Sequence, residues 1–382
     1  MIAAFAWMVA ALAAGSAFLV AANVLFWPCV RPRAASNPVP VSVLIPARNE
    51  ERSLGSCIES VLAQGSIVAE VLVYNDHSTD NTPAVVVRWS ERDRRVRAIE
   101  TLPLPEGWCG KNFACFRLAQ AAASPWLLFL DADARLLRGA VATALDEAKR
   151  RHATMLSLWP RIEACTFWER VLMPMLNFVV LGSYPAALAL RRDDRSLGLA
   201  HGACILVHRD TYRALGGHEV VRDEIFEDTR LARAWRSHGR RSICLDGQNL
   251  VRVRMYRSFS GIWHGFQKNF FTAFQSHYTF WAFLLLHAIV FWLPFVAYPL
   301  SAFYGSNAAA WGLGAATVLL SRALLAIHFR QPLWSVLFHP VAESLLLALG
   351  IASWWRCVSG KGVTWKGRAY RAGASGAAAR RL

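Results

Sequence analysis

The first 27 residues of the chain contain no charged side chain. About 20 apolar residues of this kind are enough to cross the hydrocarbon core of a bilayer as a helix. A cleaved signal peptide is the alternative, but the stretch lacks a basic start and its apolar run is too long. We therefore predict a transmembrane helix at residues 1–27. Arg31 and Arg33 follow it, which by the positive-inside rule puts the next part of the chain in the cytoplasm.

The overall composition agrees with a membrane protein. Hydrophobic residues make up 55% of the 382 residues, and 42 Lys and Arg against 26 Asp and Glu give a formal charge of +16. No RNA- or DNA-binding motif accompanies that charge, so we expect no nucleic-acid partner. No acid follows Ser344, and basic side chains crowd the tail at 356–382, which suits anionic headgroups. The eight cysteines form no CxxC pair, so we expect thiols in a reducing compartment.

A second membrane region is predicted at residues 280–355. The apolar runs 280–304 and 309–329 form a hairpin, whereas the run 333–355 is interrupted by His339, Pro340 and Glu343. A full crossing by this last run would put the basic tail outside, so we favour a re-entrant or interfacial segment, with a fourth span as the alternative. A further apolar stretch at 167–190 contains two prolines and is predicted to be a helix pair lying in the membrane interface.

Residues 36–272 alternate short apolar runs with helical stretches. The runs VSVLI (41–45), EVLVY (70–74) and WLLFL (126–130) predict strands of a parallel α/β sheet with helices on both faces. The first helix is expected to begin at Asn49 or Glu50, and the second to be capped by Ser78, Thr79 or Asp80. Ligands bind at the carboxyl ends of strands in such sheets, so the residues there carry the functional information.

Two aspartates follow the third strand in the triplet Asp131-Ala132-Asp133. In an extended segment, residues two apart point to the same side, so both carboxylates can face one site. Two carboxylates this close suit Mg²⁺ or Mn²⁺ holding a diphosphate, and a solvated turn is the alternative. Asp76 and Asp80 would converge on the same edge as partners of a nucleotide.

Two further polar clusters are candidates for chemistry. Lys111, in GWCGK, could meet a phosphate or could be an ordinary surface lysine. Glu227 and Asp228 precede an amphipathic helix; they could stabilise its N-terminus, or one could be the general base that accepts a proton from an attacking hydroxyl.

These motifs together resemble the membrane-bound family 2 glycosyltransferases, in particular carotenoid-type diaponeurosporenoate glucosyltransferases and hopanoid-associated glycosyltransferases. The resemblance rests on segments present in this order: VSVLIPARNE, NDHSTDNT, GWCGKNFAC, FLDAD, LAHGACILVHRDTYRALGGHE, FEDTRLARAW and VRMYRSFSGIWHGFQKNFF. It implies an α/β GT-A fold, Rossmann-like and cytosolic, between N- and C-terminal transmembrane helices. It also implies an inverting mechanism, a nucleotide-sugar donor and a divalent metal, Mg²⁺ or Mn²⁺.

The resemblance also implies roles for individual residues. Asp228 matches the catalytic base, with Glu227 beside it, and Asp131 and Asp133 match the ligands of the metal and donor phosphates. The expected nucleotide-sugar pocket comprises Pro46, Ala47, Asn49, Glu50, Asp76, Lys111 and Asp131. The expected acceptor or phosphate side comprises Gly216, Gly217, Arg254, Lys268 and Asn269.

One departure narrows the expected activity. The QxxRW pattern of processive synthases is absent, because Gln248 and Arg252 are spaced differently and no Trp follows. We therefore expect transfer of a single sugar, from a UDP-sugar, to the hydroxyl or carboxylate of a membrane lipid such as a carotenoid, hopanoid or glycolipid. The alternatives are a polyprenyl-phosphate sugar synthase and a transporter with a nucleotide-binding domain. The expected location is the inner membrane, multi-pass, with the catalytic domain in the cytoplasm.

Overall fold

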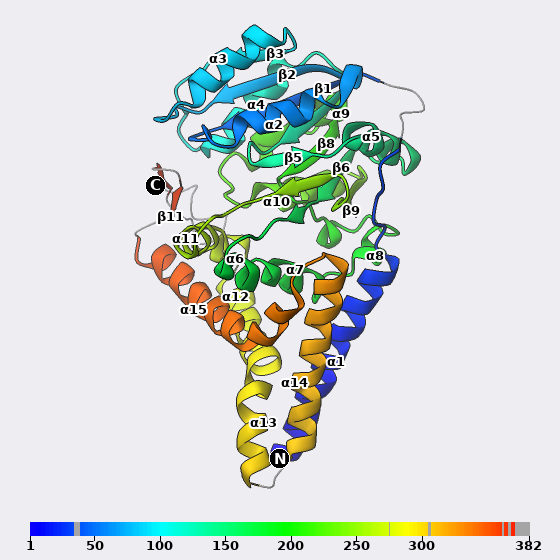
Figure 1. Ribbon diagram of the computed structural model, residues 1–382, viewed down its shortest axis with the longest axis vertical. Coiled ribbons are helices and arrows are strands. Elements are labelled where there is room, and N and C mark those ends of the chain that lie inside the picture. The colour runs from blue at the N-terminus through cyan, green and yellow to red at the C-terminus, as the bar shows by residue number, and fades with distance from the viewer. Residues whose placement is uncertain (34–38, 275, 305–306, 361–362, 366–367, 371–382) are drawn as a thin grey trace. The chain divides into compact units, whose positions relative to one another are not determined.

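A computed structural model describes residues 1–33, 39–274, 276–304, 307–360, 363–365 and 368–370 (Figure 1). The chain divides into two compact units. The α/β unit comprises Pro28–Glu163 and Ala187–Met255, and the helical unit comprises Met1–Trp27, Ala164–Ala186 and Tyr256–Leu382. The predicted domain start at residue 36 and the end of the predicted basic tail, 371–382, lie outside the described residues.

The α/β unit is built on a sheet of seven strands in the order β3-β2-β1-β4-β8-β6-β9. Their bounds are β1 Val41–Ala47, β2 Val68–Asn75, β3 Val96–Ile99, β4 Trp126–Leu130, β6 Met155–Trp159, β8 Cys204–His208 and β9 Ser242–Asp246. The three predicted strands pair in parallel, as expected, whereas β8, which was not predicted, runs antiparallel to both β4 and β6. A small second sheet joins β5 (Ala134–Leu136), β10 (Val251–Val253) and β7 (Arg161–Ile162).

The three predicted strands are all present, and parallel pairing aligns their ends. Leu44 of β1 pairs with Leu72 of β2 on one side and with Phe129 of β4 on the other. The three strands therefore end at one edge of the sheet, where the loops after β1, β2 and β4 meet.

Helices cover the sheet of the α/β unit. They are α2 (Leu54–Leu62), α3 (Thr82–Arg92), α4 (Gly110–Ala121), α5 (Ala140–Arg150), α9 (Arg209–Ala214) and α10 (Glu227–Ser237), with the short α8 (Ala186–Ala189). The predicted start of the first helix at Asn49 or Glu50 is wrong, because α2 begins at Leu54. Leu54, Ile58 and Val61 form its apolar face and are fully buried.

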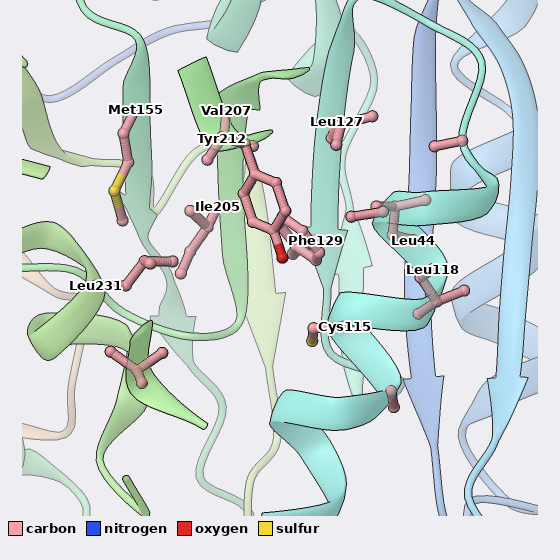
Figure 2. Packing of buried hydrophobic residues seen from close by; sticks show 14 of the residues in the cluster. Leu44, Cys115, Leu118, Leu127, Phe129, Met155, Ile205, Val207, Tyr212 and Leu231 are labelled. Atoms are coloured by element: carbon pink, nitrogen blue, oxygen red, sulfur yellow. The ribbon is translucent and has the colours of Figure 1, made fainter. Parts of the chain in front are cut away.

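The core beneath the site lies between α4, α10 and the sheet. Figure 2 shows Cys115 and Leu118 of α4 facing Leu44, Leu127 and Phe129 of the sheet. These side chains are almost completely buried, and each large one contributes about 1.5–3 kcal/mol by leaving water. This packing fixes the first turn of α4, which carries Lys111.

The helical unit contains the apolar segments. Its helices are α1 (Ile2–Phe26), α6 (Phe167–Leu172), α7 (Pro174–Leu181), α11 (Phe259–Asn269), α12 (His277–Leu286), α13 (Leu293–Tyr304), α14 (Ala308–His328) and α15 (His339–Val358). A π-helical segment, His287–Trp292, joins α12 to α13, and a 3-10 segment, η6 (Leu333–Phe338), precedes α15. Among the described residues, four helices are long and apolar enough to cross a membrane: Ile2–Phe26, His277–Tyr304, Ala308–His328 and Leu333–Val358.

Contacts within the helical unit fix the direction of three of these helices. Ala6 and Val9 of α1 pack on Ala310 and Trp311 of α14, so the two helices run the same way. The α13 helix returns against α14, where Gly314 lies close to Pro294. Figure 1 shows α15 running obliquely to α13 and α14.

Candidate active site

The loops after β1 and β2 are bound to one another. Asn49 has a left-handed backbone (φ 52°), and its side-chain oxygen accepts a hydrogen bond from the Thr79 amide at 2.8 Å. The amide of Glu50 donates to Thr82 Oγ1 at 2.7 Å. The predicted nucleotide residues Asn49 and Glu50 therefore lie against the loop that carries Asp76, and Asn49 also has a structural task.

The predicted N-cap at Ser78, Thr79 or Asp80 is wrong by one residue or more. The N-cap of α3 is Asn81, and its side chain makes no capping hydrogen bond. Asp80 instead accepts hydrogen bonds from the amide and hydroxyl of Thr82, at 3.0 and 2.6 Å. Asp80 therefore stabilises the loop itself.

Pro46, Ala47 and Asp76 lie where β1 and β2 end. Ala47 pairs with Asn75, and the Asp76 amide donates to the Ala47 carbonyl at 2.8 Å. The Arg48 guanidinium donates to the Asp76 carbonyl at 2.6 Å, and Asp76 is buried. The end of β2 is thus held against the end of β1.

Asp131 and Asp133 stand in a turn, so the extended geometry predicted for them is wrong. The strand β4 ends at Leu130, and the Ala134 amide donates to the Asp131 carbonyl at 2.9 Å, which closes the turn. The two carboxylates still share a neighbourhood. Burial raises the pKa of the Cys57 thiol, and the charges of Asp133, Glu50 and Asp131 add to that rise. Glu50, from the loop after β1, therefore lies within electrostatic reach of the turn after β4.

Lys111 connects this turn to α10. Its Nζ lies 2.8 Å from Asp131 Oδ1 and 2.8 Å from Glu227 Oε1. Its side chain is only 24% exposed, which excludes an ordinary surface lysine. Burial alone would lower the pKa of Lys111, but the two carboxylates outweigh it and hold the pKa well above the usual range.

The two acids that contact Lys111 differ in the direction of their pKa shift. Burial would raise the pKa of Glu227, but Lys111 outweighs burial and lowers it. For Asp131, burial dominates and the pKa is raised in spite of Lys111. Glu227 is therefore the firmly ionised member, paired with Lys111.

Asp228 is the next residue and has different partners. Its carboxylate accepts hydrogen bonds from the Gly202 amide and from its own neighbour Thr229, both at 2.7 Å. Burial, followed by the charge of Glu227, raises the pKa of Asp228 to about 7. A carboxylate with this pKa can take a proton near neutrality, which suits a general base. Both acids also begin α10, so the predicted helix-terminal position is correct as well.

Gly202 keeps Asp228 and Lys111 close together. A Cβ at this position would lie 3.1 Å from Lys111 Nζ and 3.3 Å from Asp228 Oδ2. The ends of β4, α4, α10 and the segment before β8 thus meet at one cluster, with Asp131, Lys111, Glu227 and Asp228 as its charged groups. Gly202 was not predicted to belong to the site, and the segment LAHGAC was its only signal in the sequence.

Two buried histidines beside the cluster were also not predicted. Burial lowers the pKa of His201 to about 3 and that of His218 to about 4. His218 Nδ1 lies 2.8 Å from the Tyr212 hydroxyl, and His201 Nδ1 accepts from the Ala203 amide at 3.2 Å. Both are therefore neutral groups that hold the wall of the cluster.

The five residues predicted for the acceptor side are spread over both units. Gly216 and Gly217 have positive φ (79° and 54°), and a Cβ on Gly217 would lie 2.2 Å from the Tyr212 ring. The close packing against Tyr212 thus explains why position 217 is a glycine, without any contact with an acceptor. Arg254 follows β10 in the α/β unit, whereas Lys268 and Asn269 lie on α11 of the helical unit.

The carboxylates at this edge of the sheet fit a divalent ion that takes most of its ligands from substrate phosphates and water. Among the described residues, no three His, Cys, Asp or Glu side chains gather as a metal cage. Mg²⁺ in particular is commonly held by one or two carboxylates together with substrate phosphates and water, and Mn²⁺ prefers the same oxygen ligands. Asp131 and Asp133, at one turn on the sheet edge, are the residues that could hold such an ion.

Comparison with known proteins agrees with this geometry. Residues 42–216 match the family model "Glycosyl transferase family 2". The chain is 27% identical, over 86% of its length and 88% of the relative, to the 4,4'-diaponeurosporenoate glycosyltransferase of Staphylococcus aureus (strain MRSA252). Its fold resembles that of a mannosyltransferase from Pyrobaculum calidifontis solved with GDP-Man and Mn²⁺, with a TM-score of 0.60, 19% identity, and 93% of this chain and 99% of that chain covered. Residues 42–216 therefore match the family 2 glycosyltransferases, the fold is of the GT-A type, and the chain is similar over most of its length to the diaponeurosporenoate glycosyltransferases.

Proposed function

We propose that the protein is an inverting glycosyltransferase that moves a single sugar from a nucleotide-sugar donor to a hydroxyl or carboxylate of a membrane lipid. One observation carries the proposal. Asp228 lies beside Lys111, and Lys111 is bound to Asp131 at the end of β4. A candidate base and a candidate phosphate site therefore belong to one cluster of the α/β unit.

The chain's own residues divide the chemistry between them. Asp228 accepts the proton of the acceptor hydroxyl, and the amides of Gly202 and Thr229 hold its carboxylate in place. The acceptor oxygen then forms a bond to the anomeric carbon as the bond to the diphosphate breaks on the opposite face. Lys111 provides positive charge where the leaving diphosphate becomes more negative. A carboxylate acceptor is already ionised and attacks without losing a proton.

Asp131 and Asp133 are the residues that would hold Mg²⁺ or Mn²⁺. Such an ion supplies further charge stabilisation of the diphosphate when it is bound. The Pyrobaculum mannosyltransferase was solved with GDP-Man and Mn²⁺, which supports a nucleoside diphosphate sugar as the class of donor. We propose a UDP-sugar, with Pro46, Ala47, Asn49, Glu50 and Asp76 lining the nucleotide pocket.

The apolar helices and the relative support a membrane lipid as acceptor, with catalysis on the cytoplasmic side. The Staphylococcus relative is named for a carotenoid carboxylate, 4,4'-diaponeurosporenoate. Because α1 and α14 run in the same direction, Arg31 after α1 and Arg330 after α14 follow the same ends of the two helices. The positive-inside rule then favours a multi-pass inner-membrane protein with these ends in the cytoplasm.

The test is transfer of labelled sugar into lipid. Membranes from a host that overexpresses the chain are given labelled UDP-glucose, and the extracted lipids are compared with those from Asp228→Asn. Asp210→Asn is the matched control, because this acid is exposed and lies on α9. We expect label in lipid with wild type and the control, and its loss with Asp228→Asn. Label that persists unchanged in Asp228→Asn would remove this residue from the mechanism.

A further inference from the structure

A continuous row of aromatic rings lies on the helical unit, on three elements that are distant in sequence. The row, here called the aromatic strip, consists of Phe167 and Trp168 of α6, Phe259 and Trp263 of α11, and Trp334 and Phe338 of η6. The ring centroids of Trp168 and Phe259 lie 5.0 Å apart. Phe167 stacks on Trp334, with 5.6 Å between the ring centroids and an angle of 12° between the ring planes. Figure 1 shows α6 next to α11 and α15 within this unit.

Much of the strip is open to its surroundings. Phe167 is 47% exposed, Trp168 37% and Trp334 39%, and Leu333 and Leu337 beside them are exposed as well. A soluble protein rarely leaves a contiguous aromatic surface uncovered. Because η6 follows the end of the candidate span Ala308–His328, the strip lies at the level where that span leaves the bilayer. Trp is enriched at this level, since its ring is apolar and its N–H is polar.

The basic side chains of the helical unit indicate that an anionic surface covers the strip. An exposed arginine lies on each of its three elements or within three residues before it in the sequence: Arg170 on α6, Arg257 before α11 and Arg330 before η6. The sequence of the helical unit contains twelve Lys and Arg but only two acids, Glu169 and Glu343.

Neither acid reaches the surface. Both have 0% exposure. Glu169 accepts hydrogen bonds from Thr166 and Cys165, and Glu343 is paired with His287 at 2.6 Å. The acids of this unit are therefore paired inside it, and the exposed charged side chains among its described residues are all basic.

We propose that the aromatic strip and Arg170, Arg257 and Arg330 form a binding surface for anionic phospholipid headgroups. The rings enter the boundary between headgroups and acyl chains, and the guanidinium groups bind the lipid phosphates. Arginine suits this task because its planar fork donates two hydrogen bonds to one phosphate. The surface is separate from sugar transfer, so its test does not depend on activity.

The first experiment measures lipid selectivity. The full chain is reconstituted into vesicles of equal parts phosphatidylcholine and phosphatidylglycerol and re-extracted in mild detergent, and the retained lipids are quantified. We expect the ratio of phosphatidylglycerol to phosphatidylcholine to rise from 1:1 in the vesicles to roughly 3:1 or more in the retained lipid. The triple variant Arg170→Gln, Arg257→Gln, Arg330→Gln should lose this enrichment, and the corresponding Arg→Lys triple should keep most of it.

The control removes the same charge from the other unit. Arg88, Arg94 and Arg213 are exposed on the α/β unit, and their triple Gln variant should retain the wild-type enrichment. No enrichment in wild type, or an equal loss in the control, would overturn the proposal. So would full retention of the enrichment by the Arg→Gln triple.

A second experiment tests the rings. Acyl-brominated phosphatidylglycerol quenches the fluorescence of nearby tryptophan. The emission of Trp334 is obtained as the difference between wild type and Trp334→Phe, and we expect it to be strongly reduced in brominated vesicles. An unquenched difference would place Trp334 away from lipid. Light scattering of the detergent-solubilised chain addresses the other occupant of such a strip, a second copy of the chain. A dimer that the change Trp334→Ala dissociates would also refute the lipid assignment.

Discussion

The ion pairs of Lys111 give the sharpest test of the cluster. Replacement by Gln removes a cation that lies 2.8 Å from both Asp131 and Glu227. At an effective dielectric constant of about 20, each pair has a gross attraction of about 6 kcal/mol, most of which is offset by the cost of burial. Two carboxylates then remain, partly buried and without their counter-ion. We expect a net loss of about 2–4 kcal/mol in the free energy of unfolding at neutral pH.

The loss should depend on pH in a definite direction. In wild type the pKa of Lys111 is raised, so its stabilisation is present at every pH below the ordinary lysine value and disappears only above the raised value. In the variant the two carboxylates lose the attraction that favoured ionisation, so their pKa values rise. The unfolded chain then ionises before the folded one, and the variant loses stability as pH rises through the acid range. The difference from wild type should therefore shrink toward low pH.

The assay is thermal unfolding of the detergent-solubilised chain across pH. A loss of about 2–4 kcal/mol corresponds to a drop of roughly 5–10 °C in Tm. The control is Asp210→Asn, which removes the exposed partner of an ion pair with Arg209 at 3.2 Å and should cost less than about 1 kcal/mol. Equal Tm values for Lys111→Gln and wild type, or a difference that does not change with pH, would refute the cluster's electrostatics.

Three further changes test other parts of the account. Gly217→Ala should lower the free energy of unfolding by about 2–4 kcal/mol, because the added Cβ meets the Tyr212 ring. Gly239 has φ 66° and open space around it, so Gly239→Ala should cost only about 1 kcal/mol. Equal drops in Tm for the two variants would contradict this packing. The rate of transfer to a lipid hydroxyl should rise with pH through about 7, the pKa of Asp228, and a rate that is flat across that value would contradict its role as base. Asp133→Asn should weaken Mn²⁺ binding, measured by spin resonance of the free ion, by about tenfold or more; unchanged binding would remove Asp133 from the metal site.

Local sequence patterns predicted the strands that position the site. WLLFL is apolar at every position, as a strand buried on both faces requires, and β4 occupies the same residues. The direction of β8 could not be predicted in this way, because an apolar run of CILVH looks the same in either direction. The shape of the Asp131-Ala132-Asp133 triplet was also beyond local rules, since the turn is closed by a backbone hydrogen bond to Ala134.

The residues of the cluster were predicted one by one, but their pairing was not. Lys111 and Glu227 are far apart in the chain, and only the packing of α4 and α10 on the same sheet brings them within 2.8 Å. Gly202 was missed because its task is to leave room between Lys111 and Asp228, which no local pattern records. The resemblance to family 2 glycosyltransferases therefore predicted which residues form the cluster, whereas their ion pairs and hydrogen bonds were found only in the structure.

Donor affinity and transfer rate, measured on the same purified Asp228→Asn protein, test the central claim most directly. The account predicts that the affinity for the nucleotide sugar stays within about threefold of wild type, while transfer to lipid falls by at least ~10²-fold. Asn keeps the shape of the side chain and an oxygen for one of the two amides that bind Asp228, so the ability to accept a proton is lost together with one hydrogen bond. Wild-type transfer by this variant would contradict the assignment of the cluster as the catalytic site.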